Sequence, residues 1–391
     1  MHESFSDVER EIVRTVERFA EERVRPLVAG YEASGTFPAD LVDEMVQLGL
    51  FGLAVPEEFG GLGLRLTVFA AVFETLARAW TTLAAYANSH ATVAHAIATY
   101  GTEDQKRRYL PGLATGEHRG ALCLSEPDCG SDLQAIRGTL VPDGEDYRLN
   151  ASKTYVTNGR RATLLLTLAR HPQSDAAGKP RFSLAIVEKA CDGVEVTTTF
   201  RKMAFGQVDT VQIEMSAVPI SSRNILGGDT GIGFRQLMDA LEVGRIAIAA
   251  SAVGLAANAV AEARKFAAER RTFGVAIDQH QAIQLKLADM ATRLVAARLI
   301  TMEAAREKET GKRCDMIGAM AKLFASEVAV KIAQDAVKVH GGAGYIKEYA
   351  VERLYREALL YTIGEGTNDI NRLVIARRIK DDERGILGLP Y

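Results

Sequence analysis

The sequence has few cysteines and no metal-binding pattern. Its 391 residues include only four cysteines, none of them in a CxxC pair: Cys123, Cys129, Cys191 and Cys314. This number is too small for a disulfide scaffold, so we expect free thiols. The chain also lacks an HExxH motif and any Cys/His quartet. We therefore predict no metal site and interpret the isolated histidines as packing or surface residues: His90, His95 and His171.

An excess of basic charge and a long signal-like apolar segment are also missing. The formal net charge is −3, whereas nucleic-acid-binding proteins usually carry an excess of positive charge. No nucleic acid is therefore expected as a partner. The N-terminal segment carries acidic residues early and has no apolar core of a secretory signal. No segment is interpreted as a transmembrane span. We therefore predict a cytoplasmic protein with no membrane partner.

The spacing of apolar residues changes twice along the chain. Residues 5–118 follow the spacing of helices, short β-rich runs begin near Gly120, and helical spacing returns after Gly227-Gly228. The expected fold class is therefore α+β, mostly α. Because helices and strands do not alternate, a Rossmann domain is excluded. The order predicts a helical domain, a β domain and a second helical domain: 1–119, 120–226 and 227–391.

Individual elements can be placed within these domains. Long amphipathic segments suited to a helix bundle and to oligomerisation occupy 233–269, 279–307 and 314–339. Strands are expected at 163–168, 182–187 and 211–215. Asp143-Gly144 predicts a hairpin turn, because glycine accepts positive φ. Pro38 is expected to open a helix.

The run LCLSEPDCGSD at 122–132 marks the entry to the β domain. On its pattern alone it is most simply a polar turn between domains. It nevertheless resembles, almost letter for letter, the signature of the acyl-CoA dehydrogenase family. Further motifs of that family stand in the same order: PEEFGGLG at 56–63, KTYVTNG at 153–159, RRTFG at 270–274, HQ at 280–281, HGGAGY at 340–345 and GEGT at 364–367. Such an ordered set covers nearly the whole chain and is far more specific than one motif.

The resemblance implies a fold, a cofactor and an assembly. Members of the family have an N-terminal helical domain, a central β barrel and a C-terminal four-helix bundle, and they bind FAD at a subunit interface of a homotetramer. Arg270 and Thr272 match residues that reach the FAD of the neighbouring subunit, where a guanidinium suits pyrophosphate oxygens. Lys338 replaces a common Gln, and Asp369 replaces a common Gln or Glu. The positions matching FAD contacts are Leu122, Leu124, Ser125, Ser131, Tyr155, Val156, Thr157, Arg270, Thr272, Phe273, His280, Gln281, Lys338, Gly341, Gly342, Thr367 and Asp369.

Glu365 matches the catalytic base of most of the family. Any single glutamate is by default a solvated surface residue, and the resemblance reverses this interpretation. Some members take the base from the position just before the arginine matching Arg245, but that position is Gly244 here. The implied reaction removes the α proton of an acyl thioester while the β hydride passes to FAD, giving a trans-2-enoyl thioester. Positions matching substrate contacts are Ser131, Glu242, Arg245 and Gly366.

The resemblance further implies acyl-CoA as the substrate and an electron-transferring flavoprotein as the electron acceptor. Two alternatives stay open: a dehydrogenase acting on an acyl or aminoacyl group bound to a carrier protein, and an acyl-CoA oxidase that uses oxygen. Monooxygenases of similar fold are disfavoured, because they need no base for an α proton. These motifs do not define the length or branching of the acyl chain.

Overall fold

The computed structural model describes residues 5–380; the outermost parts of the first and third predicted domains, 1–4 and 381–391, lie outside the described residues. The N-terminal part is helical, as predicted. A capping box opens the first helix, because the side chains of Ser6 and Glu9 each accept from the backbone N–H of the other. The elements are α1 (Asp7–Arg18), the π-helix η2 (Phe19–Val24), η3 (Arg25–Leu27), α2 (Val28–Ser34), α3 (Ala39–Gln47, after Pro38), η4 (Glu57–Phe59), α4 (Leu66–Ala79), α5 (Thr81–Tyr100) and α6 (Glu103–Thr115).

A seven-stranded sheet forms the middle of the chain. Its strands follow the order β1-β4-β2-β3-β7-β6, and β5 pairs with β4. The predicted hairpin joins β2 to β3: Asp143 pairs with Asp146, and Gly144 between them has a φ of 66°. The three predicted strands correspond to β4, β5 and β7. The elements are β1 (Gly120–Cys123), η5 (Leu133–Ala135), β2 (Thr139–Asp143), β3 (Asp146–Thr157), β4 (Leu164–Arg170), β5 (Phe182–Glu188), β6 (Val194–Thr199), β7 (Thr210–Ile220) and η6 (Ser222–Asn224).

Long helices return after the sheet and form the predicted bundle. The helix α7 is long and apolar enough to cross a membrane by length and composition, but 72% of its most apolar window is buried within the protein, as in a core helix. The helices α8, α9 and α10 pack around it, and α11 packs on α9. The elements are α7 (Gly233–Glu269), β8 (Arg271–Thr272), β9 (Val275–Ala276), η7 (Ile277–Gln279), α8 (Gln281–Glu309), α9 (Asp315–His340), η8 (Gly341–Tyr345), α10 (Ala350–Tyr361) and α11 (Asn368–Ile379).

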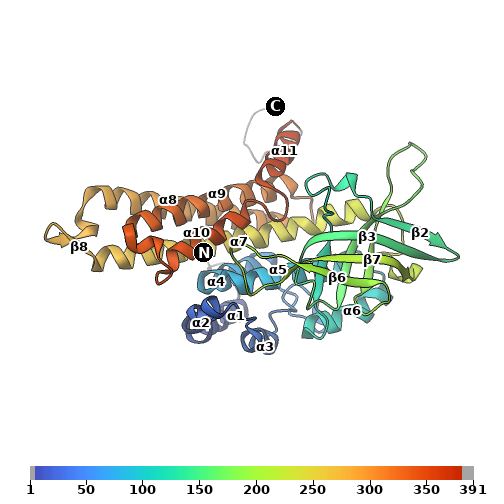
Figure 1. The fold of residues 1–391 in the computed structure, drawn as a ribbon, viewed down its shortest axis with the longest axis horizontal. Helices are drawn as coiled ribbons and strands as arrows, with labels where there is room; N and C mark the ends of the chain where they lie inside the picture. Colours follow the sequence, from blue (N-terminus) through green and yellow to red (C-terminus); the bar gives the residue numbers. More distant parts are fainter. Residues whose placement is uncertain (1–4, 381–391) are drawn as a thin grey trace.

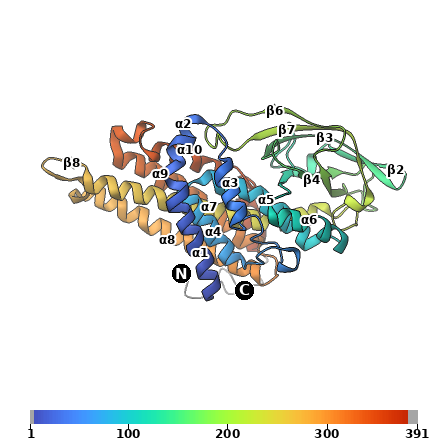
Figure 2. The same cartoon turned by 90° about the horizontal axis from the view of Figure 1, so that it is seen from below.

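The sheet and the β8–β9 hairpin lie at opposite ends of the molecule (Figure 1). The view from below shows the same separation (Figure 2). Between the ends, α4 and α5 pack against α7, so the N-terminal helices and the bundle share one large hydrophobic core. A second core joins α5, α6 and α7 to the sheet. The predicted fold class is confirmed, and the expected barrel is a curled sheet.

Candidate active site

Glu365 lies in the short turn that joins α10 to α11. Its φ of 54° and the φ of 85° at Gly366 place two consecutive residues in the left-handed region. The N–H of Gly364 closes the end of α10, and the Thr367 side chain caps α11. The Glu365 carboxylate contacts α5 and faces α7 in the interior. Burial raises the pKa of this carboxyl group above the ordinary value for glutamate.

The Glu365 carboxylate has one partnered oxygen and one free oxygen. Oε1 accepts a hydrogen bond from Asn88 Nδ2 at 3.2 Å, whereas Oε2 is buried and has no hydrogen-bond partner among residues 5–380. The charges of Arg245 and Lys322 and the Asn88 bond lower the Glu365 pKa and so oppose the larger effect of burial. A Cβ added to Gly244 would lie only 2.8 Å from Oε2. The arrangement suits a general base, since Oε2 can take a proton without losing a hydrogen bond.

The helix α5 connects this base to the sheet. Asn88 contacts the Glu365 carboxylate, and the Oγ of the next residue, Ser89, accepts from the Leu122 N–H at 3.3 Å. Two neighbouring residues of α5 therefore link the turn that carries Glu365 to the start of the 122–132 run within one chain. Sequence reasoning did not select Asn88 or Ser89. The available signal was the run of three polar residues, Asn88 to His90, in the middle of a largely apolar helix.

His90 fixes the position of β1. Its Nδ1 accepts from the Gly120 N–H at 3.2 Å, so the proton lies on Nε2, which is 3.2 Å from the Phe51 carbonyl. Burial lowers the His90 pKa to about 3, and the ring is neutral at physiological pH. His90 is therefore a packing residue, as interpreted from the sequence.

A buried ion pair holds the 122–132 run against β3. Lys153 is fully buried, and its Nζ donates to Glu126 Oε1 at 2.8 Å and to the Leu124 carbonyl at 3.1 Å. The Thr154 N–H donates to the Ser125 carbonyl at 2.9 Å. Two further backbone N–H groups donate to the Glu126 carboxylate. The backbone at Leu124 and Ser125 is thus fixed from several sides.

The end of β3 presents an aromatic surface beside this run. Tyr155 is 68% exposed, and the centroid of its ring lies 5.4 Å from that of Phe200. Thr157 is half-buried and Ser131 is exposed. Val156 is buried in the core of the sheet, so only its backbone is available to a ligand at this surface. An exposed aromatic side chain beside fixed backbone groups suits a planar ring system.

A second group of predicted FAD positions lies in and beside the β8–β9 hairpin. Thr272 Oγ1 and His280 Nε2 are 2.9 Å apart, and Phe273, at the tip, is 97% exposed. Arg270 and Gln281 are exposed at the adjoining ends of α7 and α8. Because the hairpin and the sheet stay at opposite ends in both views (Figures 1 and 2), a single chain does not bring all of these positions into one site.

The end of α9 belongs to this second group. His340 stacks on Phe266 near the end of α7, with ring centroids 4.2 Å apart. The following Gly341 has a φ of 59°, and a Cβ added to Gly341 or Gly342 would meet no atom within 4 Å. The space beside this backbone is open to a ligand. Lys338 is exposed one turn earlier.

The predicted substrate positions on α7 have different surroundings. Arg245 is buried and follows Gly244 directly, and its Nε has no partner among the described residues. Glu242 Oε2 accepts from Lys308 Nζ at 2.9 Å and from Cys314 Sγ at 3.3 Å, so this carboxylate is already engaged inside the fold. Asp369 on α11 is a predicted FAD position. Its side chain is 89% exposed and forms an ion pair with Arg372 of the same helix.

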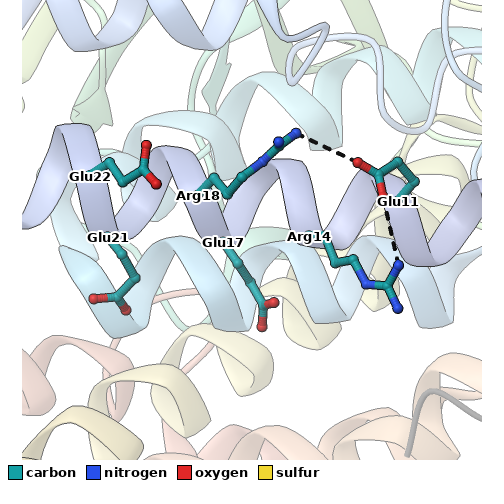
Figure 3. Close-up of a pocket in the computed structure, with 6 residues that line it drawn as sticks. All are labelled: Glu11, Arg14, Glu17, Arg18, Glu21 and Glu22. Carbon is teal, nitrogen blue, oxygen red and sulfur yellow. Dashed lines mark ion pairs between the residues drawn. The ribbon is translucent and has the colours of Figure 1, made fainter.

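A surface hollow elsewhere has no comparable chemistry. It lies along α1 and η2, where Arg14 and Arg18 pair with the exposed carboxylate of Glu11 (Figure 3). Exposed ion pairs of this kind interact weakly in water, and they offer a ligand no buried polar group. No group of three or more His, Cys, Asp or Glu residues suited to a metal ion is found within residues 5–380.

Comparisons with known proteins agree with this fold. Profiles of the acyl-CoA dehydrogenase N-terminal, middle and C-terminal domains match residues 6–117, 121–218 and 231–380. An acyl-CoA dehydrogenase of Bacillus subtilis is 38% identical over 365 residues, which are 93% of this chain and 96% of that protein. The structure of butyryl-CoA dehydrogenase from Megasphaera elsdenii is 31% identical, with a TM-score of 0.93, and covers 97% of this chain and 100% of its own. A chain from a structural study of the electron transferring flavoprotein of Acidaminococcus fermentans is 35% identical, with a TM-score of 0.93. The match covers 98% of this chain and 100% of that chain.

Proposed function

Since the chain belongs to the acyl-CoA dehydrogenase family, whose members are FAD-dependent enzymes, we propose that it converts an acyl-CoA thioester to the trans-2-enoyl thioester with Glu365 as the base. The observation that carries this proposal is the buried Glu365 carboxylate with one free oxygen. When bound, FAD supplies the acceptor for the hydride that leaves the β carbon. The residues of this chain bind and orient the substrate and remove the α proton.

Glu365 removes the α proton through Oε2. The α proton of a thioester is weakly acidic, so a carboxylate in water removes it poorly. Burial raises the pKa of Glu365 and makes the carboxylate a stronger base. Asn88 holds Oε1, which leaves Oε2 as the oxygen that receives the proton.

The backbone of the same turn is suited to the thioester carbonyl. Within residues 5–380 the Glu365 N–H donates no hydrogen bond. A backbone N–H that is free to donate can bond to the carbonyl oxygen of the thioester. Such a bond stabilises the negative charge that develops on this oxygen as the proton leaves. Placing the base and this donor on one residue orients the α carbon toward Oε2, which reduces the entropic cost of reaching the transition state.

The fit to FAD requires a second copy of the chain. The fixed backbone at Leu124 and Ser125, together with the exposed Tyr155, suits the flavin ring. The open backbone at Gly341-Gly342 and the exposed Arg270 suit the rest of the cofactor, but they adjoin the β8–β9 hairpin, which lies at the end of the molecule opposite the sheet. We therefore propose that two copies complete each FAD site and that the protein is a homo-oligomer, most simply a tetramer.

We further propose that an electron-transferring flavoprotein accepts the electrons and that the protein works in the cytoplasm. The 35% identical chain from a structural study of an electron transferring flavoprotein supports a protein acceptor. The test is a panel of straight, branched and aromatic acyl-CoA substrates, assayed with an electron-transferring flavoprotein and with oxygen. Peroxide formed as fast as substrate is consumed would identify an oxidase, and activity on carrier-protein thioesters alone would identify the biosynthetic alternative.

A further inference from the structure

The turn that carries Glu365 rests on a fully buried lysine. Lys322 lies on α9 with 0% exposure, and its Nζ donates to the Gly366 carbonyl at 2.8 Å and to Asn368 Oδ1 at 2.9 Å. Lysines are rarely buried unless a carboxylate pairs with them. Lys322 has no carboxylate within ion-pair distance among residues 5–380. Its ammonium group therefore donates to these two oxygens at the turn and at the start of α11. Burying the charge without a paired carboxylate costs free energy.

One acceptor is the carbonyl of Gly366, which is the second of the two left-handed residues, and the other belongs to a residue shortly after it. Gly366 follows Glu365 directly, and Asn368 is the first residue of α11. The Gly366 carbonyl also accepts from Asn371 Nδ2 at 2.9 Å, while Asn368 Nδ2 donates to Ser326 Oγ of α9 at 3.0 Å. A positive φ at a residue other than glycine persists only where the surroundings determine it. Here α9 and α11 both hold the turn, and Lys322 contributes two of the hydrogen bonds.

We propose that Lys322 is a positioning residue for the base: it fixes Gly366 and Asn368 so that the Glu365 carboxylate stays directed into the site. The ammonium also acts on the carboxylate through its charge. This inference rests on the proposed role of Glu365 as the base. Lys322 acts through the turn and is not assigned a contact with the substrate.

The charges around Lys322 determine how the effect appears in a pH profile. Arg245 on α7, Glu365 in the turn and Glu327 on α9 are the charged groups that act on it. Burial lowers the Lys322 pKa to about 8, so the group is mainly protonated at neutral pH. Its charge lowers the pKa of Glu365. Removing the charge therefore raises the Glu365 pKa, and activity that depends on the ionised carboxylate begins at a higher pH.

The experiment compares Lys322→Met with Lys331→Met in the purified, FAD-loaded protein. Lys331 lies on the same helix but is exposed and pairs with Asp335, so it serves as the matched control. For Lys322→Met we expect a loss of kcat of roughly 100-fold, as for a misplaced catalytic group, with little change in KM. The acid limb of the pH profile should also move to higher pH. FAD content, read from the flavin absorbance, should match the control.

A second variant separates position from charge and covers the case in which Lys322→Met does not fold. Lys322→Gln keeps N–H donors but has no charge, so it should recover part of kcat while its acid limb stays shifted. Wild-type kcat and an unshifted limb in either folded Lys322 variant would overturn the inference. Full activity in Glu365→Gln would instead overturn the proposed function, so the two failures are distinguishable.

Discussion

The Glu365 carboxylate occupies space that a side chain at residue 244 would need. A Cβ on Gly244 would lie 2.8 Å from Glu365 Oε2, which is shorter than any ordinary van der Waals contact. We expect Gly244→Ala to displace the carboxylate and to lower kcat by roughly 10- to 100-fold, measured by flavin reduction with excess substrate. Gly318→Ala is the control, because its new Cβ would meet only Cys314 Sγ, at 4.0 Å. Equal activity of the two variants would show that the contact at Gly244 has no functional effect.

The same contact limits rescue from the alternative base position. In a Glu365→Gln background the amide keeps the volume of the original side chain, so Gly244→Glu has no room for its carboxylate. We expect Gly244→Glu to restore dehydrogenation only when it is combined with Glu365→Gly, which removes the side chain at residue 365. Anaerobic flavin bleaching on mixing with substrate is the measurement. Rescue in the Gln background would contradict the packing described for this pair.

Glu365→Gln alone should retain FAD and thioester binding but lose roughly 1,000-fold in the rate of flavin bleaching, because the amide has no basic oxygen of the required strength. Glu303→Gln is the control, since Glu303 is exposed and forms a surface ion pair with Arg306 on α8. A Glu365→Gln protein that bleaches as fast as wild type would remove Glu365 from the mechanism.

The pH dependence of kcat/KM should report the raised pKa of Glu365. The base must be ionised, so activity should rise with pH through a pKa above the ordinary glutamate value of 4.5. The Asn88 hydrogen bond stabilises the ionised form and lowers that pKa. Asn88→Ala should therefore move the rise to higher pH. A shift to lower pH would mean that Asn88 favours the protonated carboxyl group instead.

Arg270→Ala should weaken FAD retention. Arg270 is exposed beside the β8–β9 hairpin, at the end of the molecule opposite the sheet, and we propose that its guanidinium binds the FAD of a second copy. Arg264→Ala is the matched control, because Arg264 is an exposed arginine near the end of α7, which Arg270 directly follows. FAD released on dilution and the oligomeric state are measured together by size-exclusion chromatography with absorbance detection. Tight FAD binding by a monomeric wild-type protein would rule out the shared site.

Lys153→Met should destabilise the FAD-free protein by about 3–5 kcal/mol, because it leaves the buried Glu126 carboxylate without its cation. The comparison is Arg137→Ala, which removes an exposed ion pair with Asp128 and should change stability by less than about 1 kcal/mol. Urea unfolding gives both values. Equal stabilities would mean that the buried pair contributes nothing to holding the 122–132 run.

The sequence predicted the fold best where one period continued without interruption. The predicted segment 233–269 has the same limits as α7, and the buried strands β4 and β5 fall where β-rich runs were expected. The short β1 was not predicted, because it is four residues long and its second half overlaps the polar signature. The strand β6 was also missed, since it is largely exposed and lacks a buried face.

The surroundings of the site could not be predicted in the same way. Lys322 is an ordinary position in an amphipathic pattern, and its acceptor Gly366 is 44 residues away along the chain. Burial of a lysine depends on such distant partners, which no local pattern encodes. Similarly, Asn88 reaches Glu365 across 277 residues. Motifs identified Glu365, while only the folded chain shows what determines its pKa and direction.

The separation of the sheet from the β8–β9 hairpin has a genetic consequence. If each cofactor site draws on the sheet of one copy and the hairpin of another, two differently damaged chains can compensate for each other. A chain with Arg270→Ala still offers an intact Glu365, and a chain with Glu365→Gln still offers an intact Arg270. Coexpression of these two alleles should therefore produce mixed assemblies that contain complete sites, whereas Arg270→Ala alone retains FAD weakly and Glu365→Gln alone lacks the base.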